Sequence, residues 1–197
     1  MSQKRNVELI YEIGMLRFVD RMWKQFFGPD LQNVSEHSFR IVFTAMLIAR
    51  MEKIKIDESK LMKMALIHDL TESRTGDLHY QSRRYCTRDE KLAAEDIFKG
   101  TIFERDFLEI YREYEERKSW EAKIVKDADH LDVDIEIREA TTRGGKLPKT
   151  WKSHRKMVYK EFYTASAKKL AKTLEGSDPN DWHQMGRNRF NTGDWKK

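Results

Sequence analysis

Apolar side chains recur at spacings of three and four residues along most of this chain, as Leu61, Met64 and Ala65 do. That period is typical of amphipathic helices, and no stretch alternates for long enough to predict a strand. The 197 residues include only 3 prolines and 9 glycines, the residues that punctuate the turns of a sheet. The sequence therefore predicts an all-α fold, a helical bundle with an irregular C-terminal tail.

Capping residues divide this pattern into separate helices. Asn33, Asp57, Thr87 and Ser119 each stand where a helix is expected to begin, and Thr87 starts a capping box with Glu90. The predicted helices span approximately residues 7–27, 33–48, 57–72, 87–98, 103–117, 119–143 and 158–170.

The length fits one domain, which we expect over residues 1–175, followed by a tail over 176–197. Residues 148–152 are expected to form a surface loop. No apolar run approaches the roughly 18 residues that cross a bilayer, and the single cysteine, Cys86, cannot form an internal disulfide. We therefore expect a cytoplasmic protein without a membrane partner, in which Cys86 serves packing.

Positive charge is concentrated toward the C-terminus. The chain carries a net charge of +5, and residues 142–197 are strongly basic. Such a segment could bind nucleic acid or attract a small phosphorylated substrate. No nucleic-acid motif accompanies it, so the second interpretation is favoured, and nucleic-acid binding stays the alternative.

The most informative pair of residues is His68-Asp69. The neighbours Leu66, Ile67 and Leu70 are apolar, so the pair is expected near the interior. A buried aspartate needs a partner, and a cation is a natural one. Taken alone, the dipeptide is better explained by a core histidine beside an aspartate that caps a helix or forms an ion pair.

Two further residues give the pair a metal-binding context. His37 lies on the inner stripe of its helix, and Asp129 lies on a helix whose apolar stripe faces inward. Two imidazoles and two carboxylates suit one divalent ion: Mn, Co, Fe, Ni, Zn or Mg. Asp127 is the main rival of Asp129 as fourth ligand.

Other polar residues nearby are given structural roles. His79 and His130 could add ligands for a second ion, but their positions favour a site with one metal. Asp132 and Asp134 are expected to be solvated.

The order His, His-Asp, Asp on successive helices resembles that of the HD superfamily of metal-dependent phosphohydrolases. The local sequence is similar to the 5'-deoxynucleotidase branch of that superfamily, over roughly Leu9 to Ile137. The matching segments are Asn33–Ser38, His68–Leu78 and Lys126–Asp129. The resemblance implies that His37, His68, Asp69 and Asp129 hold the metal, and that the protein could form a homodimer.

Two acidic residues acquire roles from this resemblance. Glu72 is expected one helical turn after His68, where a carboxylate can deprotonate a metal-bound water. The matching family residue of Asp77 contacts the sugar 3'-hydroxyl. The structural alternatives are an exposed glutamate at a helix end and an aspartate in the turn after Gly76.

Arg21 and Trp23 are the candidate phosphate and sugar contacts. The family has an arginine followed directly by a tryptophan, whereas Met22 separates the two residues here. The alternatives are a solvated arginine and a core tryptophan.

The resemblance implies removal of the 5'-phosphate from deoxyribonucleoside monophosphates. One alternative is hydrolysis of another small phosphoester or of a nucleoside triphosphate, although the sequence shows no obvious Lys/Arg cluster for a polyphosphate. Another is a regulatory nucleotide-binding HD protein without turnover.

Overall fold

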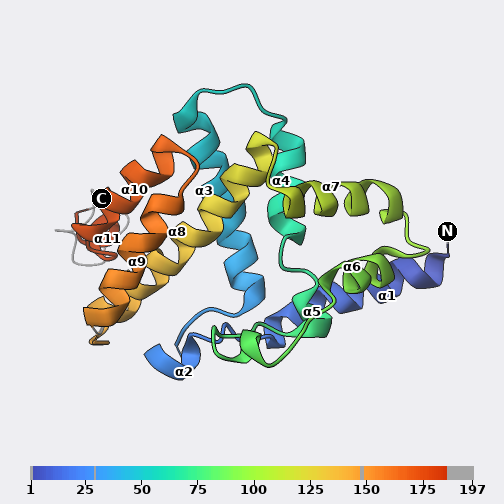
Figure 1. Ribbon diagram of the computed structural model, residues 1–197, viewed down its shortest axis with the longest axis horizontal. Coiled ribbons are helices and arrows are strands. Elements are labelled where there is room, and N and C mark those ends of the chain that lie inside the picture. Colours follow the sequence, from blue (N-terminus) through green and yellow to red (C-terminus); the bar gives the residue numbers. More distant parts are fainter. Residues whose placement is uncertain (1, 29, 147–148, 186–197) are drawn as a thin grey trace, which may run out of the picture.

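The computed structural model describes residues 2–28, 30–146 and 149–185 (Figure 1). Within these ranges the chain forms helices and no sheet, which confirms the predicted all-α class. None of the helices in these ranges combines the length and apolar composition that a membrane span requires.

Three helices build the centre of the molecule. α3 (Val34–Glu52) packs against both α4 (Glu58–Ile67) and α8 (Trp120–Thr142). Ile41, Ile48, Leu61 and Ile124 are fully buried between them. The apolar stripes that predicted these helices are therefore the surfaces that form the core.

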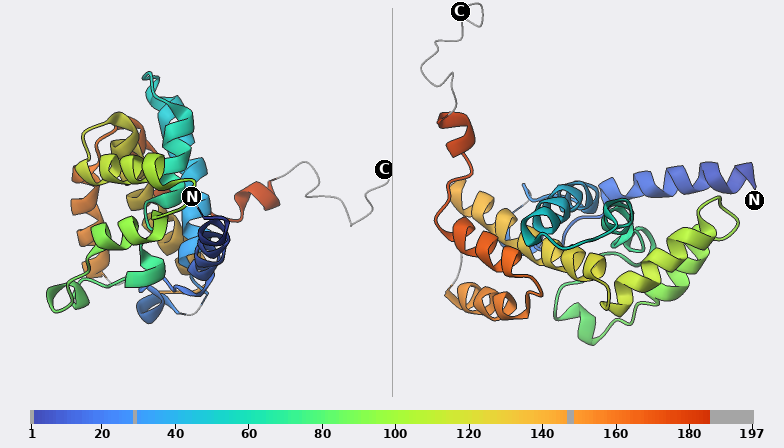
Figure 2. Two further views of the ribbon diagram at one scale, coloured as in Figure 1. Left: turned by 90° about the vertical axis from the view of Figure 1, so that its right-hand side faces the viewer. Right: turned by 90° about the horizontal axis from the view of Figure 1, so that it is seen from above.

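Shorter helices surround this centre. α6 (Glu90–Phe98) and α7 (Glu104–Glu116) pack on each other, and α7 also contacts α4 and α8. α9 (Lys149–Glu161) and α10 (Ala165–Glu175) lie at the end of the molecule opposite the N-terminus of α1 (Gln3–Met15) (Figure 2).

The prediction of a single helix over residues 7–27 is wrong. α1 is followed by a 3-10 turn, η1 (Leu16–Phe18), and by the short α2 (Lys24–Phe27). Between them Val19 becomes extended, and its carbonyl accepts a hydrogen bond from the Val34 amide at 2.9 Å. This contact interrupts the helix and brings Arg21 to the N-terminal end of α3.

The helix expected to run from Asp57 to Glu72 is also shorter. Asp57 caps α4 as predicted, since its side chain accepts from the Lys60 amide. α4 ends at Ile67, however, and a tight turn leads into the one-turn α5 (Glu72–Thr75). The chain therefore bends at the His68-Asp69 pair, and Glu72 does not follow His68 on one helix.

The remaining boundaries differ in smaller ways. α6 is capped by Asp89 rather than by Thr87. The predicted last helix is two helices, α9 and α10, and residues 149–152 belong to α9 rather than to a loop. One turn, α11 (Asp181–Gln184), follows, and residues 186–197 of the predicted tail lie outside the described residues.

Candidate metal centre

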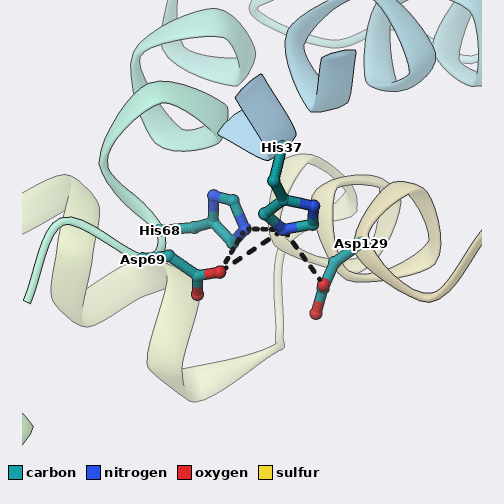
Figure 3. A group of neighbouring side chains, drawn as sticks. All are labelled: His37, His68, Asp69 and Asp129. Atoms are coloured by element: carbon teal, nitrogen blue, oxygen red, sulfur yellow. Dashed lines mark hydrogen bonds and ion pairs between the residues drawn. The ribbon is translucent and has the colours of Figure 1, made fainter. Parts of the chain in front are cut away.

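Four side chains from three parts of the core converge on one point (Figure 3). His37 comes from the first turn of α3, His68 and Asp69 from the turn after α4, and Asp129 from the middle of α8. One candidate ligand atom from each lies within 4.8 Å of the others. The structure thus brings together the four residues that the sequence singled out.

The donor set fits a metal ion better than it fits hydrogen bonding. The Nε2 atoms of His37 and His68 face each other at 3.3 Å. Oxygens of Asp69 and Asp129 each lie 3.4 Å from the same His37 nitrogen. Two imidazole nitrogens and two carboxylate oxygens at these separations match the spacing of ligands around one divalent cation.

Hydrogen bonds on the far side of each ring orient the two imidazoles. His37 Nδ1 lies 2.7 Å from a carboxylate oxygen of Asp132, and His68 Nδ1 lies 2.8 Å from the Ala65 carbonyl. Each bond leaves Nε2 directed at the cluster, as metal-binding histidines require. Burial alone would lower the pKa of His37, but hydrogen bonds to Asp129 and Asp132 raise it to about 10. The same negative charge favours a cation at this point.

Asp132 is therefore not solvated, and that prediction is wrong. Its side chain is fully buried; Gln32 donates to the oxygen that His37 contacts, and Arg40 donates to the other oxygen. The prediction for Asp134 is wrong as well, because Asp134 is buried against Arg155 with two contacts of 2.8 Å.

Asp127, the rival fourth ligand, points away from the cluster. Its carboxylate accepts from the Tyr163 and Thr164 amides at 2.9 and 2.8 Å and from the Thr164 hydroxyl at 2.7 Å. These bonds join α8 to the start of α10. Asp127 holds two helices together while Asp129, half a turn further along, faces the cluster.

Glu72 lies buried beside the four candidate ligands, with 5% of its surface exposed. One carboxylate oxygen is 3.5 Å from Arg88, and the other has no hydrogen-bond partner. Burial, and then the negative charges of Asp69 and Asp77, raise the pKa of Glu72 to about 9. This carboxyl group can therefore hold or accept a proton next to the cluster.

Arg21 is buried rather than solvated. Its guanidinium lies 3.2 Å from Asp69, 3.9 Å from Asp129 and 4.0 Å from Asp77. Asp77 accepts a hydrogen bond from the Met22 amide at 3.1 Å, so the extra residue between Arg21 and Trp23 contributes a backbone contact.

Trp23 stands at the rim, half-buried, rather than in the core. Its ring centroid is 5.5 Å from that of Tyr80 and 4.9 Å from that of Trp151 in α9. A cavity of about 290 Å³ connects this rim to the cluster and is lined by Trp23, Tyr80, Arg21, Glu72 and Asp77, among others.

A family model described as HD domain matches residues 13–177. The chain belongs to the HD domain family. It is 32% identical to the 5'-deoxynucleotidase HDDC2 of Dictyostelium discoideum over 64% of this chain and 72% of that relative. It is 31% identical to the 5'-deoxynucleotidase HDDC2 of Danio rerio, over 68% of each chain. Among solved structures, the PH0347 protein of Pyrococcus horikoshii OT3 is similar with a TM-score of 0.68 and 27% identity, over 86% of this chain and 96% of that chain.

The cavity of this HD domain is more basic than its sequence suggests. Six cationic side chains line it: Arg21, Arg83, Arg88, Arg117, Lys126 and Arg155. The prediction that the pocket has no obvious Lys/Arg cluster is therefore wrong, because the fold brings together cations from helices and loops that are far apart in the sequence. Arg21 was predicted from the sequence, and Lys126, in the segment that also bears Asp129, carried a further signal that sequence reasoning could have used.

The remaining histidines and the cysteine are not part of the cluster. His79 lies 3.0 Å from the Ser82 hydroxyl. His130 lines the cavity, where burial and the nearby Lys126 lower its pKa to about 4. Cys86 is exposed and does not serve packing.

Proposed function

We propose that this HD domain protein is a metal-dependent phosphohydrolase that removes phosphate from deoxyribonucleoside 5'-monophosphates. The observation that carries the proposal is the convergence of four candidate metal ligands with Glu72 and Arg21 at one basic cavity. The names of the relatives, 5'-deoxynucleotidases at 32% and 31% identity, support the choice of substrate.

In this mechanism His37, His68, Asp69 and Asp129 hold one divalent ion. When bound, such an ion polarises the phosphoryl oxygens and lowers the pKa of a coordinated water. Glu72 accepts the proton of the attacking water as the new P–O bond forms and the bond to the nucleoside oxygen breaks. Glu72 then returns this proton to the leaving oxygen, so that the nucleoside departs as an alcohol.

Arg21 supplies positive charge to the phosphate. Its contacts with Asp69 and Asp129 place the guanidinium beside the cluster, and its Nε, 4.0 Å from Asp77, makes no hydrogen bond. A guanidinium in that position can bind a phosphate oxygen with a charge-assisted hydrogen bond.

The nucleoside is proposed to lie toward the rim of the cavity. One oxygen of Asp77 accepts from the Met22 amide, and the carboxylate can also accept from a sugar 3'-hydroxyl. Trp23 and the half-exposed Tyr80 offer aromatic surface on which a base can stack. Stacking of this kind tolerates different bases.

A second candidate, hydrolysis of a nucleoside triphosphate or another small phosphoester, is favoured by the six cationic side chains around the cavity. Polyphosphates need such charge. A regulatory nucleotide-binding role is the third candidate.

One panel separates these functions. Metal-stripped protein is refilled with Mn, Co, Zn or Mg and assayed for phosphate release from deoxyribo- and ribonucleoside monophosphates, triphosphates and a sugar phosphate. Metal-dependent release from deoxyribonucleoside monophosphates, lost in Glu72→Gln, is expected. Release from triphosphates alone would support the second candidate, and tight binding without release would support the third.

We further propose that residues 1–175 form the catalytic domain, that residues 176–197 form a tail, and that the protein is a cytoplasmic homodimer. Phe39, Phe43 and Leu47 expose more than half of their surfaces along one side of α3. An exposed apolar stripe of this kind suits contact with a second copy.

A further inference from the structure

Buried side-chain polar atoms that make no hydrogen bond gather in the cavity of the metal centre. Five such side-chain atoms occur in the described part of the chain, and four belong to residues that line this cavity. They are Arg21 Nε, Glu72 Oε2, Arg117 Nη1 and His130 Nδ1. Buried polar groups are normally hydrogen-bonded, so this concentration points to a polar ligand or water in the cavity. Arg117 has no role in the mechanism described above.

Arg117 is held in place at the edge of the cluster. It terminates α7 in the left-handed conformation, with φ 53°, where glycine is favoured. Its guanidinium lies 3.4 Å from the centroid of the Tyr114 ring, and that ring contacts the His68 ring at 5.7 Å. The Nη2 atom of Arg117 lies 3.5 Å from a carboxylate oxygen of Glu115, its counter-ion. The Nη1 atom is buried and makes no hydrogen bond. The side chain is thus fixed with one donor free.

Lys126 approaches the cluster from α8. Its ammonium lies 2.7 Å from Oδ2 of Asp129, one helical turn further along. Arg21 and His37 approach the other oxygen, Oδ1, at 3.9 and 3.4 Å. The two oxygens of Asp129 therefore separate Lys126 from Arg21, and the two cations stand on different sides of the ligand carboxylate.

Neutralisation of the ligand carboxylates changes what these cations can bind. A divalent ion held by Asp69 and Asp129 offsets the negative charge that now attracts Arg21 and Lys126. Both cations then gain by contacting an anion instead. A phosphate on such an ion presents non-bridging oxygens to both sides.

We propose that Lys126 and Arg117 form a second phosphate-binding wall of the metal centre, across Asp129 from Arg21. The wall binds oxygens of the phosphate that sits at the metal. This assignment rests on the proposed phosphohydrolase function for its substrate, but its ligand chemistry, a phosphate dianion next to a divalent ion, can be tested without turnover.

The test measures binding of inorganic phosphate to the Mn-loaded full chain by calorimetry, together with Mn affinity by chelator competition. Arg117→Met and Lys126→Met are each expected to weaken phosphate binding by roughly tenfold or more, the size of a lost charge-assisted hydrogen bond. Both should keep Mn affinity within about threefold of the parent protein, and Arg117→Lys should retain part of the phosphate affinity.

Matched controls are Arg112→Met on the exposed side of α7 and Lys123→Met, whose ammonium lies over the Trp120 ring outside the cavity. Neither should change phosphate binding. The proposal is overturned if Mn-loaded parent protein does not bind phosphate, if both cavity variants bind phosphate normally, or if Lys126→Met loses Mn instead, which would make Lys126 a support for Asp129. If both cavity variants lose phosphate binding while the parent protein binds phosphate but has no nucleotidase activity, the wall is sustained and the proposed substrate is rejected.

Discussion

Asp132 lies outside the candidate ligand set but contacts the far side of the His37 ring. It is fully buried and is contacted by His37, Arg40 and Gln32, so its charge is fixed on the far side of the His37 ring. Carboxylates in that position fix the imidazole tautomer and raise its basicity.

We therefore expect Asp132→Asn to weaken metal affinity by about 10- to 100-fold. Chelator competition measures this directly. Asp134→Asn is the matched control, because Asp134 lies on the same helix as Asp132 but is buried against Arg155 of α9 and touches no candidate ligand. Equal metal affinity in Asp132→Asn and the parent protein would contradict the assigned role.

Glu72 gives the metal-free protein a pH-dependent stability. Its pKa is raised from 4.5 to about 9, first by burial and then by Asp69 and Asp77. Between these values the folded protein binds more protons than the unfolded chain, so the free energy of unfolding falls as pH rises.

Relative to Glu72→Gln, which cannot ionise, the parent protein should lose stability from pH 5 to pH 8, by up to about 1.4 kcal/mol per pH unit. Urea unfolding of both proteins at each pH measures the difference. Added metal should reduce this pH-dependent loss of stability, because a nearby cation favours the ionised carboxylate of Glu72. A difference that stays constant with pH would refute the predicted protonation of Glu72.

At the level of helices, Asp127 and Asp129 have different roles, although the two residues look equivalent in the sequence. Asp127 accepts three hydrogen bonds from Tyr163 and Thr164 and so anchors the start of α10 on α8. Asp127→Ala should lower the free energy of unfolding by about 2–3 kcal/mol, because buried donors lose their acceptor. Metal affinity should change little.

Asp129→Ala should show the reverse pattern, with metal binding lost and the contact between α8 and α10 kept. Urea unfolding and metal titration of the two variants side by side measure both effects. If Asp127→Ala abolished metal binding in a folded protein, the assignment of the two aspartates would have to be exchanged.

Periodicity predicted the start of a helix well where a local capping residue also marked it. Asn33 and Asp57 cap α3 and α4 as their side chains indicated. The pattern failed at the end of α4, because His68 and Glu72 keep helical spacing although the chain turns between them. It failed in the N-terminal segment because Val19 bonds to Val34, a contact that no local sequence signal encodes.

The candidate site likewise has residues that the local sequence predicts and residues that only the packing of helices brings together. The four candidate ligands were predictable because they form a known order of residue types along successive helices. Arg117 and Arg155 were not, since each reaches the cavity from a different helix and only the packing brings them together. Asp132 was misjudged because a charged residue near a ligand can face solvent or support the ligand ring, and only its burial decides.

For the whole molecule, the candidate metal centre lies where the three central helices meet. Its candidate ligands come from α3, from the turn after α4 and from α8, and these helices supply most of the buried core. A cation bound there links all three and offsets the repulsion between Asp69 and Asp129. An ion that binds only the folded chain stabilises it by mass action, by about 2.7 kcal/mol at a concentration 100 times its Kd.

Removal of metal should therefore lower the Tm by about 5–10 °C, since 1 kcal/mol corresponds to roughly 2–4 °C in a chain of this size. Scanning calorimetry of stripped and Mn-loaded protein measures the shift. Asp129→Ala should have no metal-dependent shift, whereas Asp127→Ala should keep the full shift at a lower starting Tm. If the parent protein showed no metal-dependent shift in Tm, the cluster would not bind the ion tightly enough to link the helices. An equal shift in Asp129→Ala would place the stabilising ion elsewhere on the protein.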